Sequence, residues 1–275
     1  MFVASRNFFE QESIEEKTRC RRVHPVNSGW VGQGVEKLDA KESEDLKEAF
    51  NIMAYTEKPK QTMPKMLEGE VPLIADFISA CHDLCMDLLE GMALSLDLEK
   101  DYFTLRHAPS APSGTTLRLL YYPSTTTTSQ ALVRAGAHSD YGSLTLLFQQ
   151  EGSDASGLQV LLPTNKARGE GSEAGEWLDV PASPERVLVN VGDLMEAWTG
   201  SRWPSTIHRV LVPANTFVGP RLSIAYFLQP ADDVKLHRIG TLAAGQEERG
   251  GGRVFEEGMT SGEWLARRFE ATYRK

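Results

Sequence analysis

The sequence predicts a mainly β protein, either a barrel or a sandwich, with flanking α-helices. Short runs of β-type residues separated by turn residues recur from residue 115 onward, and eight such runs at this spacing are typical of those architectures. An amphipathic run at residues 72–92 precedes them and indicates a helix. The 275 residues suit one large domain, because β barrels reach ~200–250 residues without splitting.

Residues 1–100 are predicted to form an N-terminal helical segment that packs on the barrel. Within it, residues 9–22 and 41–51 are dense in Glu, Lys and Arg and are expected to be exposed helices. A stronger helix is expected to begin near Pro72, since proline suits a first helical turn. Its apolar residues recur at three- and four-residue steps and are expected to face the core: Ile74, Phe77, Ile78, Cys81, Leu84, Cys85, Leu88, Leu89 and Met92.

Residues 101–235 are predicted to form the β core. A helical turn is expected at residues 192–200, between two strands. Residues 236–275 are expected to be a C-terminal extension with a helix, because Thr260 and Glu263 have the spacing of a capping box. The eight strands are expected within residues 115–122, 132–139, 143–150, 157–163, 176–181, 186–192, 205–213 and 221–230.

Composition and charge restrict the partners. A net charge of −9 argues against nucleic acids and anionic membranes, because affinity for phosphates comes largely from Lys and Arg. Three cysteines, an odd number, fit a reduced protein better than a secreted one. The N-terminus lacks the apolar core of a signal peptide, and no stretch approaches the ~20 apolar residues of a membrane span. We expect a cytoplasmic monomer with a small-molecule substrate and no nucleic-acid or membrane partner.

A histidine and an aspartate, His138 and Asp140, stand two residues apart in the segment "AGAHSDYG". Side chains alternate faces in an extended chain, so both can reach one common object. His208 stands in a later β-type run. Two histidines and one carboxylate are a facial ligand set for non-haem Fe(II) that leaves positions open for other ligands. Taken singly, each residue is explained as well by a hydrogen bond in an ordinary core.

Two later residues, Arg221 and Ser223, also share one face of a predicted strand. An arginine aimed into a barrel is a buried charge that needs an anionic partner. A carboxylate ligand could supply it, held by both prongs of the guanidinium with the serine hydroxyl beside it. An ion pair between Arg221 and an aspartate of the chain is the alternative.

Four further residues are placed by the same alternation. Arg118, Leu120 and Tyr122 share one face of their predicted strand and are expected to line one cavity. Phe227 has the parity of Arg221, which makes it a candidate wall of the pocket. Ordinary barrel core is the alternative for Phe227.

The order of seven segments closely resembles the iron- and 2-oxoglutarate-dependent dioxygenases of the isopenicillin N synthase-like family. The resemblance covers residues 116–230, and a looser match at "GWVGQGVEKLDAKESEDLKEAF" extends it toward the N-terminus. It implies a double-stranded β-helix, or jelly-roll barrel, with the long helix outside. The segments are "LRLLYYP", "HSDYGSLTLLFQ", "GLQV", "EWLDVP", "VLVNVGDLMEAWT", "STIHRV" and "RLSIAYF".

The resemblance implies an oxygenase that uses Fe(II), 2-oxoglutarate and O2 to hydroxylate or desaturate a small organic molecule, releasing succinate and CO2. The iron ligands of the family are matched by His138, Asp140 and His208. The residues that bind the distal carboxylate of 2-oxoglutarate are matched by Arg221 and Ser223, assisted by Tyr122. The candidate substrate contacts are then Arg118, Leu120 and Phe227.

Two departures from the family are present. Leu120 stands where many plant members have an asparagine, and the strand and helix that usually open the family are not recognised here. Residues 1–100 are therefore expected to be shortened relative to the family, and a missing strand would expose a sheet edge.

Three alternative functions stay open at this point. The first is an iron oxidase of the isopenicillin N synthase type that uses no 2-oxoglutarate and binds its substrate's carboxylate at Arg221 and Ser223. A zinc hydrolase could use two histidines and an aspartate, but it would have no use for the arginine and serine. A catalytically impaired ligand-binding barrel is the third. The substrate itself is left open among small acids, nucleobases such as thymine, terpenoids and fungal secondary metabolites.

Overall fold

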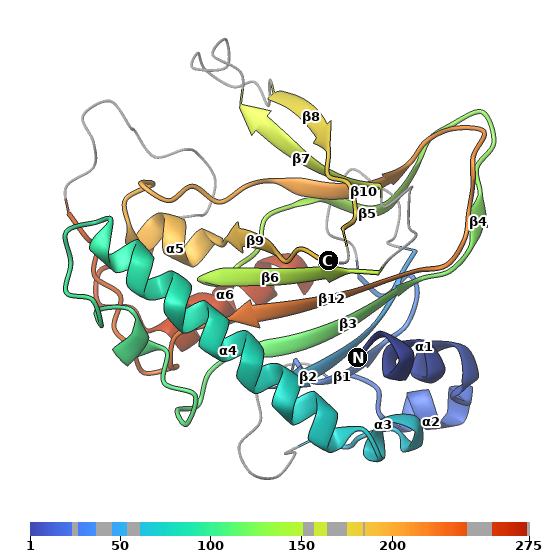
Figure 1. Ribbon diagram of the computed structural model, residues 1–275, viewed down its shortest axis with the longest axis horizontal. Helices are drawn as coiled ribbons and strands as arrows, with labels where there is room; N and C mark the ends of the chain where they lie inside the picture. The colour runs from blue at the N-terminus through green and yellow to red at the C-terminus, as the bar shows by residue number, and fades with distance from the viewer. Residues whose placement is uncertain are drawn as a thin grey trace.

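Two antiparallel β-sheets form the centre of the molecule, and a long helix lies across one of them (Figure 1). The computed structural model describes residues 1–23, 27–36, 46–53, 61–150, 157–163, 175–183, 185–240 and 255–273. Within these ranges, no helix has both the length and the apolar character needed to span a membrane. The protein is mainly β with flanking helices, as the sequence predicts.

The larger sheet has six strands in the order β1-β2-β3-β12-β6-β9, and the smaller has four in the order β5-β10-β7-β8. The eight strands expected from the sequence are confirmed as β3, β5 to β10 and β12. The larger sheet contains β1 (Gly29–Val31), β2 (Glu48–Met53), β3 (Thr116–Tyr122), β12 (Arg221–Leu228), β6 (Leu144–Gln149) and β9 (Leu188–Val191). The smaller contains β5 (Leu132–His138), β10 (His208–Val212), β7 (Leu158–Pro163) and β8 (Gly175–Asp179), and β4 (Thr125–Thr126) pairs with β11 (Phe217–Val218).

The helices lie before, between and after the strands. The expected long helix is confirmed as α4, the helical turn as α5 and the C-terminal helix as α6. A capping box begins α6, since Thr260 and Glu263 each accept a hydrogen bond from the other's backbone N–H, at 3.2 and 2.8 Å. The bounds are α1 Phe2–Gln11, α2 Ile14–Arg19, α3 Lys65–Glu68, α4 Val71–Leu94, a 3-10 turn Thr104–Arg106, α5 Asp193–Trp198 and α6 Ser261–Tyr273.

Alternation along the central strands separates two buried layers. In β12, Leu222 and Ile224 belong to the main apolar core together with Ile74 and Leu89 of α4. The alternate residue Ala225 belongs instead to a second cluster, which contains residues of both sheets. The larger sheet therefore packs against helices on one face and faces the smaller sheet on the other.

Two helix predictions for the N-terminal segment are wrong. Residues 48–51, expected to be helical, belong to β2, because pairing with β3 buries Ala49, Phe50 and Ile52; residues 41–45 lie outside the described part of the chain. The helix expected at residues 9–22 is two helices, since the Ser13 side chain accepts from Glu16 N at 3.2 Å and begins α2.

Burial in the helices also differs from the expectation, and within residues 9–22 the apolar Phe9 and Cys20 are buried. Glu16 and Lys17 of α2 are buried, because Glu16 pairs with Arg19 and Lys17 with Glu48. Leu84 of α4 is 38% exposed, because the apolar residues of this helix span a wider arc than the sheet covers.

Candidate active site

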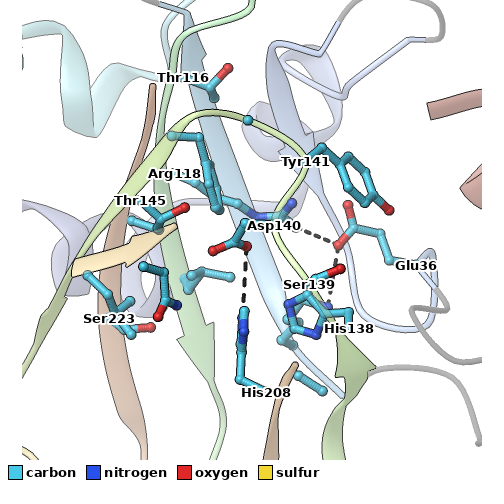
Figure 2. A pocket seen from close by; sticks show the side chains of 18 of the residues that line it. Glu36, Thr116, Arg118, His138, Ser139, Asp140, Tyr141, Thr145, His208 and Ser223 are labelled. Carbon is cyan, nitrogen blue, oxygen red and sulfur yellow. Dashed lines mark hydrogen bonds and ion pairs between the residues drawn. The ribbon is translucent and has the colours of Figure 1, made fainter. Parts of the chain in front are cut away.

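An open cavity lies between the two sheets (Figure 2). It holds about 1130 Å³ of empty space, a figure that includes its open mouth to solvent. Leu265 and Phe269 of α6 line it as well as the strands. Every site residue expected from the sequence lines this cavity: Arg118, Leu120, Tyr122, His138, Asp140, His208, Arg221, Ser223 and Phe227.

Three side chains, which we call the metal group, converge in this cavity: His138, Asp140 and His208. His138 ends β5 and His208 begins β10, and the two residues are paired across the sheet. One ligand atom from each of the three lies within 4.8 Å of the other two. The Nε2 atom of His208 is 3.8 Å from Asp140 Oδ1, which is too long for a hydrogen bond and leaves room for a shared ion.

Backbone carbonyls fix the orientation of both imidazole rings. Nδ1 of His138 lies 2.7 Å from the carbonyl oxygen of Gly136, and Nδ1 of His208 lies 3.0 Å from that of Thr206. A carbonyl oxygen only accepts, so each Nδ1 carries a hydrogen, and Nε2 is the ring nitrogen directed toward a metal. Burial, and after it the neighbouring His208, lowers the pKa of His138 to about 3, so this ring is neutral at pH 7.

The carboxylate of Asp140 has one oxygen without a protein partner. Asp140 is 8% exposed, and its Oδ2 is buried and accepts no hydrogen bond from the described residues. An unsatisfied buried carboxylate oxygen is costly, and a cation between Asp140 and the two imidazoles would compensate it. The donor set, two imidazoles and one carboxylate, fits Fe(II).

The chain around Asp140 is held by the start of α5. The carbonyl oxygen of Asp140 accepts from Asp193 N at 2.7 Å. The Asp193 side chain accepts from Ser139 Oγ at 3.0 Å and forms an ion pair with Arg268 of α6 at 2.6 Å. Asp193 is fully buried, so the segment that carries two metal ligands is fastened to both helices.

A close contact between Gly142 and Gly192 allows this attachment. A Cβ atom on Gly192 would lie 2.2 Å from the carbonyl oxygen of Gly142, so any larger residue would push the two segments apart. The glycines therefore let the chain after Asp140 meet the start of α5.

A second group, which we call the carboxylate clamp, consists of Arg221, Ser223 and Tyr122. Arg221 is 2% exposed, and its Nη1 and Nη2 atoms lie 3.5 Å from Ser223 Oγ and 3.1 Å from Gln149 Oε1. Its guanidinium carbon lies 5.0 Å from the centre of the Tyr122 ring. Burial lowers the pKa of Arg221, whereas Tyr122 beside it raises it.

The anion that Arg221 requires does not come from the described part of the chain. No described carboxylate forms an ion pair with it, and its Nε atom is buried without a hydrogen-bond partner. The alternative of an ion pair between Arg221 and an aspartate is therefore not found among these residues. The free Nε–H and the remaining Nη hydrogens suit a bound carboxylate.

Strand register orders the predicted residues along the cavity. Arg221 lies opposite Tyr122, Ser223 opposite Leu120, and Phe227 opposite Thr116. Leu120 therefore lies beside the carboxylate clamp, while Phe227 lies four cross-strand pairs further along the two strands. The two residues, expected together on the substrate side, lie at different depths.

Two charged residues of the cavity, Glu36 and Lys47, were not predicted from the sequence. Figure 2 shows Glu36 and Arg118 directed toward each other; Glu36 Oε2 lies 2.5 Å from Arg118 Nη2 and 3.4 Å from Lys47 Nζ. Glu36 and Lys47 come from a segment without hydrophobic periodicity, where alternation gives no guidance. Their only signal in the sequence is that both fall inside the looser match to the family.

Non-haem Fe(II) oxygenases are the class of enzyme in which two histidines and one carboxylate share a metal and leave positions open. The metal group offers that ligand set between two β-sheets, and the buried Arg221 beside it suits an anionic cosubstrate.

Comparison with known proteins agrees with this class. The profile of the 2OG-Fe(II) oxygenase superfamily matches residues 113–230. A proline hydroxylase of Petromyces alliaceus is 30% identical over 294 aligned residues, which span 99% of this chain and 84% of that protein. A full-length Neurospora crassa protein, solved in complex with alpha-KG and thymine, superposes with a TM-score of 0.76 at 29% identity, over 99% of this chain and 82% of that one. A Caulobacter crescentus 2OG-Fe(II) oxygenase family protein gives 0.72 at 28% identity, over 98% and 84%.

The chain belongs to the 2-oxoglutarate-Fe(II) oxygenase superfamily, in its isopenicillin N synthase-like group. It is an Fe(II)- and 2-oxoglutarate-dependent dioxygenase of small molecules.

Proposed function

We propose that the metal group binds Fe(II) and that the carboxylate clamp binds the distal carboxylate of 2-oxoglutarate. The observation that carries both assignments is a pair of unsatisfied buried groups in one cavity, Asp140 Oδ2 and Arg221 Nε. The first calls for a cation and the second for an anion. When bound, iron and 2-oxoglutarate supply the oxidising chemistry, in which O2 is consumed and succinate and CO2 are released.

We further propose that the two sheets are the halves of a double-stranded β-helix, or jelly-roll barrel. Residues 101–235 are its core, residues 1–100 extend the larger sheet with β1 and β2 and pack helices against it, and residues 236–275 are a C-terminal extension. Support comes from the second apolar cluster, in which Leu120 of the larger sheet joins Val210 of the smaller. A barrel of this kind excludes water from the site while leaving one end open for the substrate.

Oxygen consumption of the iron-loaded protein tests the proposed function. With a substrate present, consumption should depend on added 2-oxoglutarate and should yield one succinate per 2-oxoglutarate used. Consumption that continues without 2-oxoglutarate would indicate the 2-oxoglutarate-independent oxidase instead. A protein that binds 2-oxoglutarate but never forms succinate with any candidate would be the impaired ligand-binding barrel.

We propose that the substrate is a small polar molecule with its polar end near Arg118. The support is the charged network of Glu36, Lys47 and Arg118 at one part of the cavity wall, with the apolar Phe227 on the strand next to Arg118. Leu120 is proposed as a further wall residue between this network and the clamp. The proposed reaction is a hydroxylation or a desaturation of that molecule. A panel with thymine, free proline, small acids and terpenoids, screened for substrate-dependent succinate, would identify the class.

Shortening Phe227 to alanine is expected to uncouple the reaction. An apolar wall shapes the approach of a C–H bond and excludes water, so without it 2-oxoglutarate would still be consumed but less of it would yield oxidised substrate. The measurement is the ratio of product to succinate, with thermal melting beside it. Phe217→Ala is the control, because Phe217 is 70% exposed on β11.

The alternative for Phe227 is ordinary packing. A fully buried Phe→Ala change costs roughly 3–5 kcal/mol of stability, and the partly buried Phe227 should cost less than that. A variant that melts early but keeps the parent ratio of product to succinate would contradict the substrate role. Leu120→Ala is compared in the same assay, and because Leu120 lies opposite Ser223 its loss should also raise the 2-oxoglutarate requirement.

We propose from the sequence alone that the protein is a cytoplasmic monomer without nucleic-acid or membrane partners. The support is its net charge of −9 and its three cysteines. Light scattering of the purified protein measures the oligomeric state directly.

A further inference from the structure

A second arginine is buried beside the carboxylate clamp. Arg134 of β5 is 1% exposed, and its Nη2 donates a hydrogen bond to the carbonyl oxygen of Pro123. Its guanidinium carbon lies 5.1 Å from the centre of the Tyr122 ring. Burial lowers the pKa of Arg134 to about 10, so the side chain is still charged at pH 7. Arg134 does not line the cavity, so it does not reach the cosubstrate itself.

Tyr122 thus contacts two guanidinium groups. The guanidinium carbons of Arg221 and Arg134 lie 5.0 Å and 5.1 Å from the centre of the Tyr122 ring. The positive charge of Arg221 contributes to the lowered pKa of Arg134. Among the described residues, neither arginine has a carboxylate partner. Desolvated cations on an aromatic face are held by its quadrupole, but a ring does not neutralise two charges.

The uncompensated charge lies at the end of the cavity proposed for the distal carboxylate. 2-Oxoglutarate is a dianion with one carboxylate at the metal, so its other carboxylate is the anion available to both arginines. The contact with Arg221 would be direct. The contribution of Arg134 would be electrostatic and would also act through the position of the Tyr122 ring.

We propose that Arg134 is a positioning residue for 2-oxoglutarate, which holds Tyr122 against Arg221 and adds a second positive charge for the distal carboxylate. The proposal rests on the proposed function. A merely structural Arg134 would only donate its hydrogen bond to Pro123 and fill space, and its charge would not affect the binding of 2-oxoglutarate.

The test uses Arg134→Gln, which removes the charge but keeps a donor for the Pro123 carbonyl. Two ligands are titrated into the Fe(II)-loaded protein under argon and followed by calorimetry: 2-oxoglutarate, and 2-oxopentanoate, in which a methyl group replaces the distal carboxylate. We expect binding of 2-oxoglutarate to weaken about tenfold, in line with a desolvated cation-aromatic contact and a lost charge. Binding of 2-oxopentanoate should change by less than about twofold, because it has no distal charge.

Arg106→Gln is the matched control. Arg106 also lies over a tyrosine ring, 4.0 Å from Tyr102, and also donates to a backbone carbonyl, but it does not line or adjoin the clamp. It should leave both affinities unchanged. Arg134→Met, similar in volume to the arginine stem, is the second neutral variant and decides the test if Arg134→Gln does not melt cooperatively.

Two results would overturn the proposal. Either the neutral variants keep the parent affinity for 2-oxoglutarate, or they weaken both ligands equally, as a loosened fold would. Failure of the proposed function is a different result, because the parent protein would then bind no 2-oxoglutarate at all.

Discussion

Replacing Asp140 with alanine is expected to abolish turnover and to reduce the iron content of the purified protein sharply. Asp140 would supply the only carboxylate of the metal group, and its Oδ2 has no hydrogen-bond partner among the described residues. Changes in residues that only support metal ligands cost about 10–100-fold in metal affinity, so losing a ligand should cost at least about a hundredfold. Iron per chain, measured after exhaustive dialysis, and succinate formation check this.

The metal-free protein gives an independent measurement of the same variant. Without metal, Asp140 is a buried carboxylate with an unsatisfied oxygen, so Asp140→Ala removes a cost of about 1–3 kcal/mol. The metal-free variant should therefore melt no lower than the metal-free parent, although it no longer gains stability from added Fe(II). Asp179→Ala is the control, since Asp179 is an exposed carboxylate on β8 that accepts a hydrogen bond from Gln159. If Asp140→Ala bound as much iron as the parent protein, Asp140 would not be a metal ligand.

The β core was predictable because its strands carry both turn boundaries and alternation. In β3 and β12 one face is apolar against the helices and the other carries Arg118, Tyr122, Arg221 and Ser223. Period-two alternation needs only a local sequence to be recognised. β2 was not recognised, because Glu48–Met53 follows a charged run and becomes a strand only by pairing with β3. A tertiary partner of that kind leaves no local signal.

Site residues could be predicted where side chains alternate regularly between the two faces of a strand, but not where this alternation is interrupted. His138 and Asp140 lie on one side although the strand ends at His138. In the pairing of β5 with β10 the register shifts twice, between His208 and Val210 and again before Leu211. One-residue irregularities exchange the two faces of a strand, so the position of Arg134 beside Tyr122 could not be derived from its spacing to His138. Glu36 and Lys47 reach the cavity from irregular backbone, for which spacing carries no information at all.

Replacing Arg221 of the carboxylate clamp with lysine is expected to raise the 2-oxoglutarate requirement strongly. Arg221→Lys keeps a positive charge but loses the planar fork that can bind a carboxylate by two parallel hydrogen bonds. The guanidinium is also held by Gln149 and Ser223 at once, which a single ammonium group cannot reproduce. A hydrogen bond to a charged group contributes about 1.5–3 kcal/mol, so the half-saturating concentration of 2-oxoglutarate should rise roughly ten- to a hundredfold.

Ser223→Ala is expected to weaken 2-oxoglutarate binding less than Arg221→Lys does. Ser223 Oγ accepts from Arg221 Nη1 at 3.5 Å, the limit of hydrogen-bond distance, so this contact should contribute only about 0.5–1.5 kcal/mol although the guanidinium is charged. Its loss should raise the 2-oxoglutarate requirement by only about two- to tenfold, clearly less than Arg221→Lys. Titrations of 2-oxoglutarate at saturating substrate measure both variants, with Arg106→Lys as a control for an arginine outside the cavity. Superimposable curves for the parent and Arg221→Lys would mean that the distal carboxylate is bound elsewhere. Since Arg221 is buried and has no described carboxylate partner, that result would also leave its charge without a compensating anion.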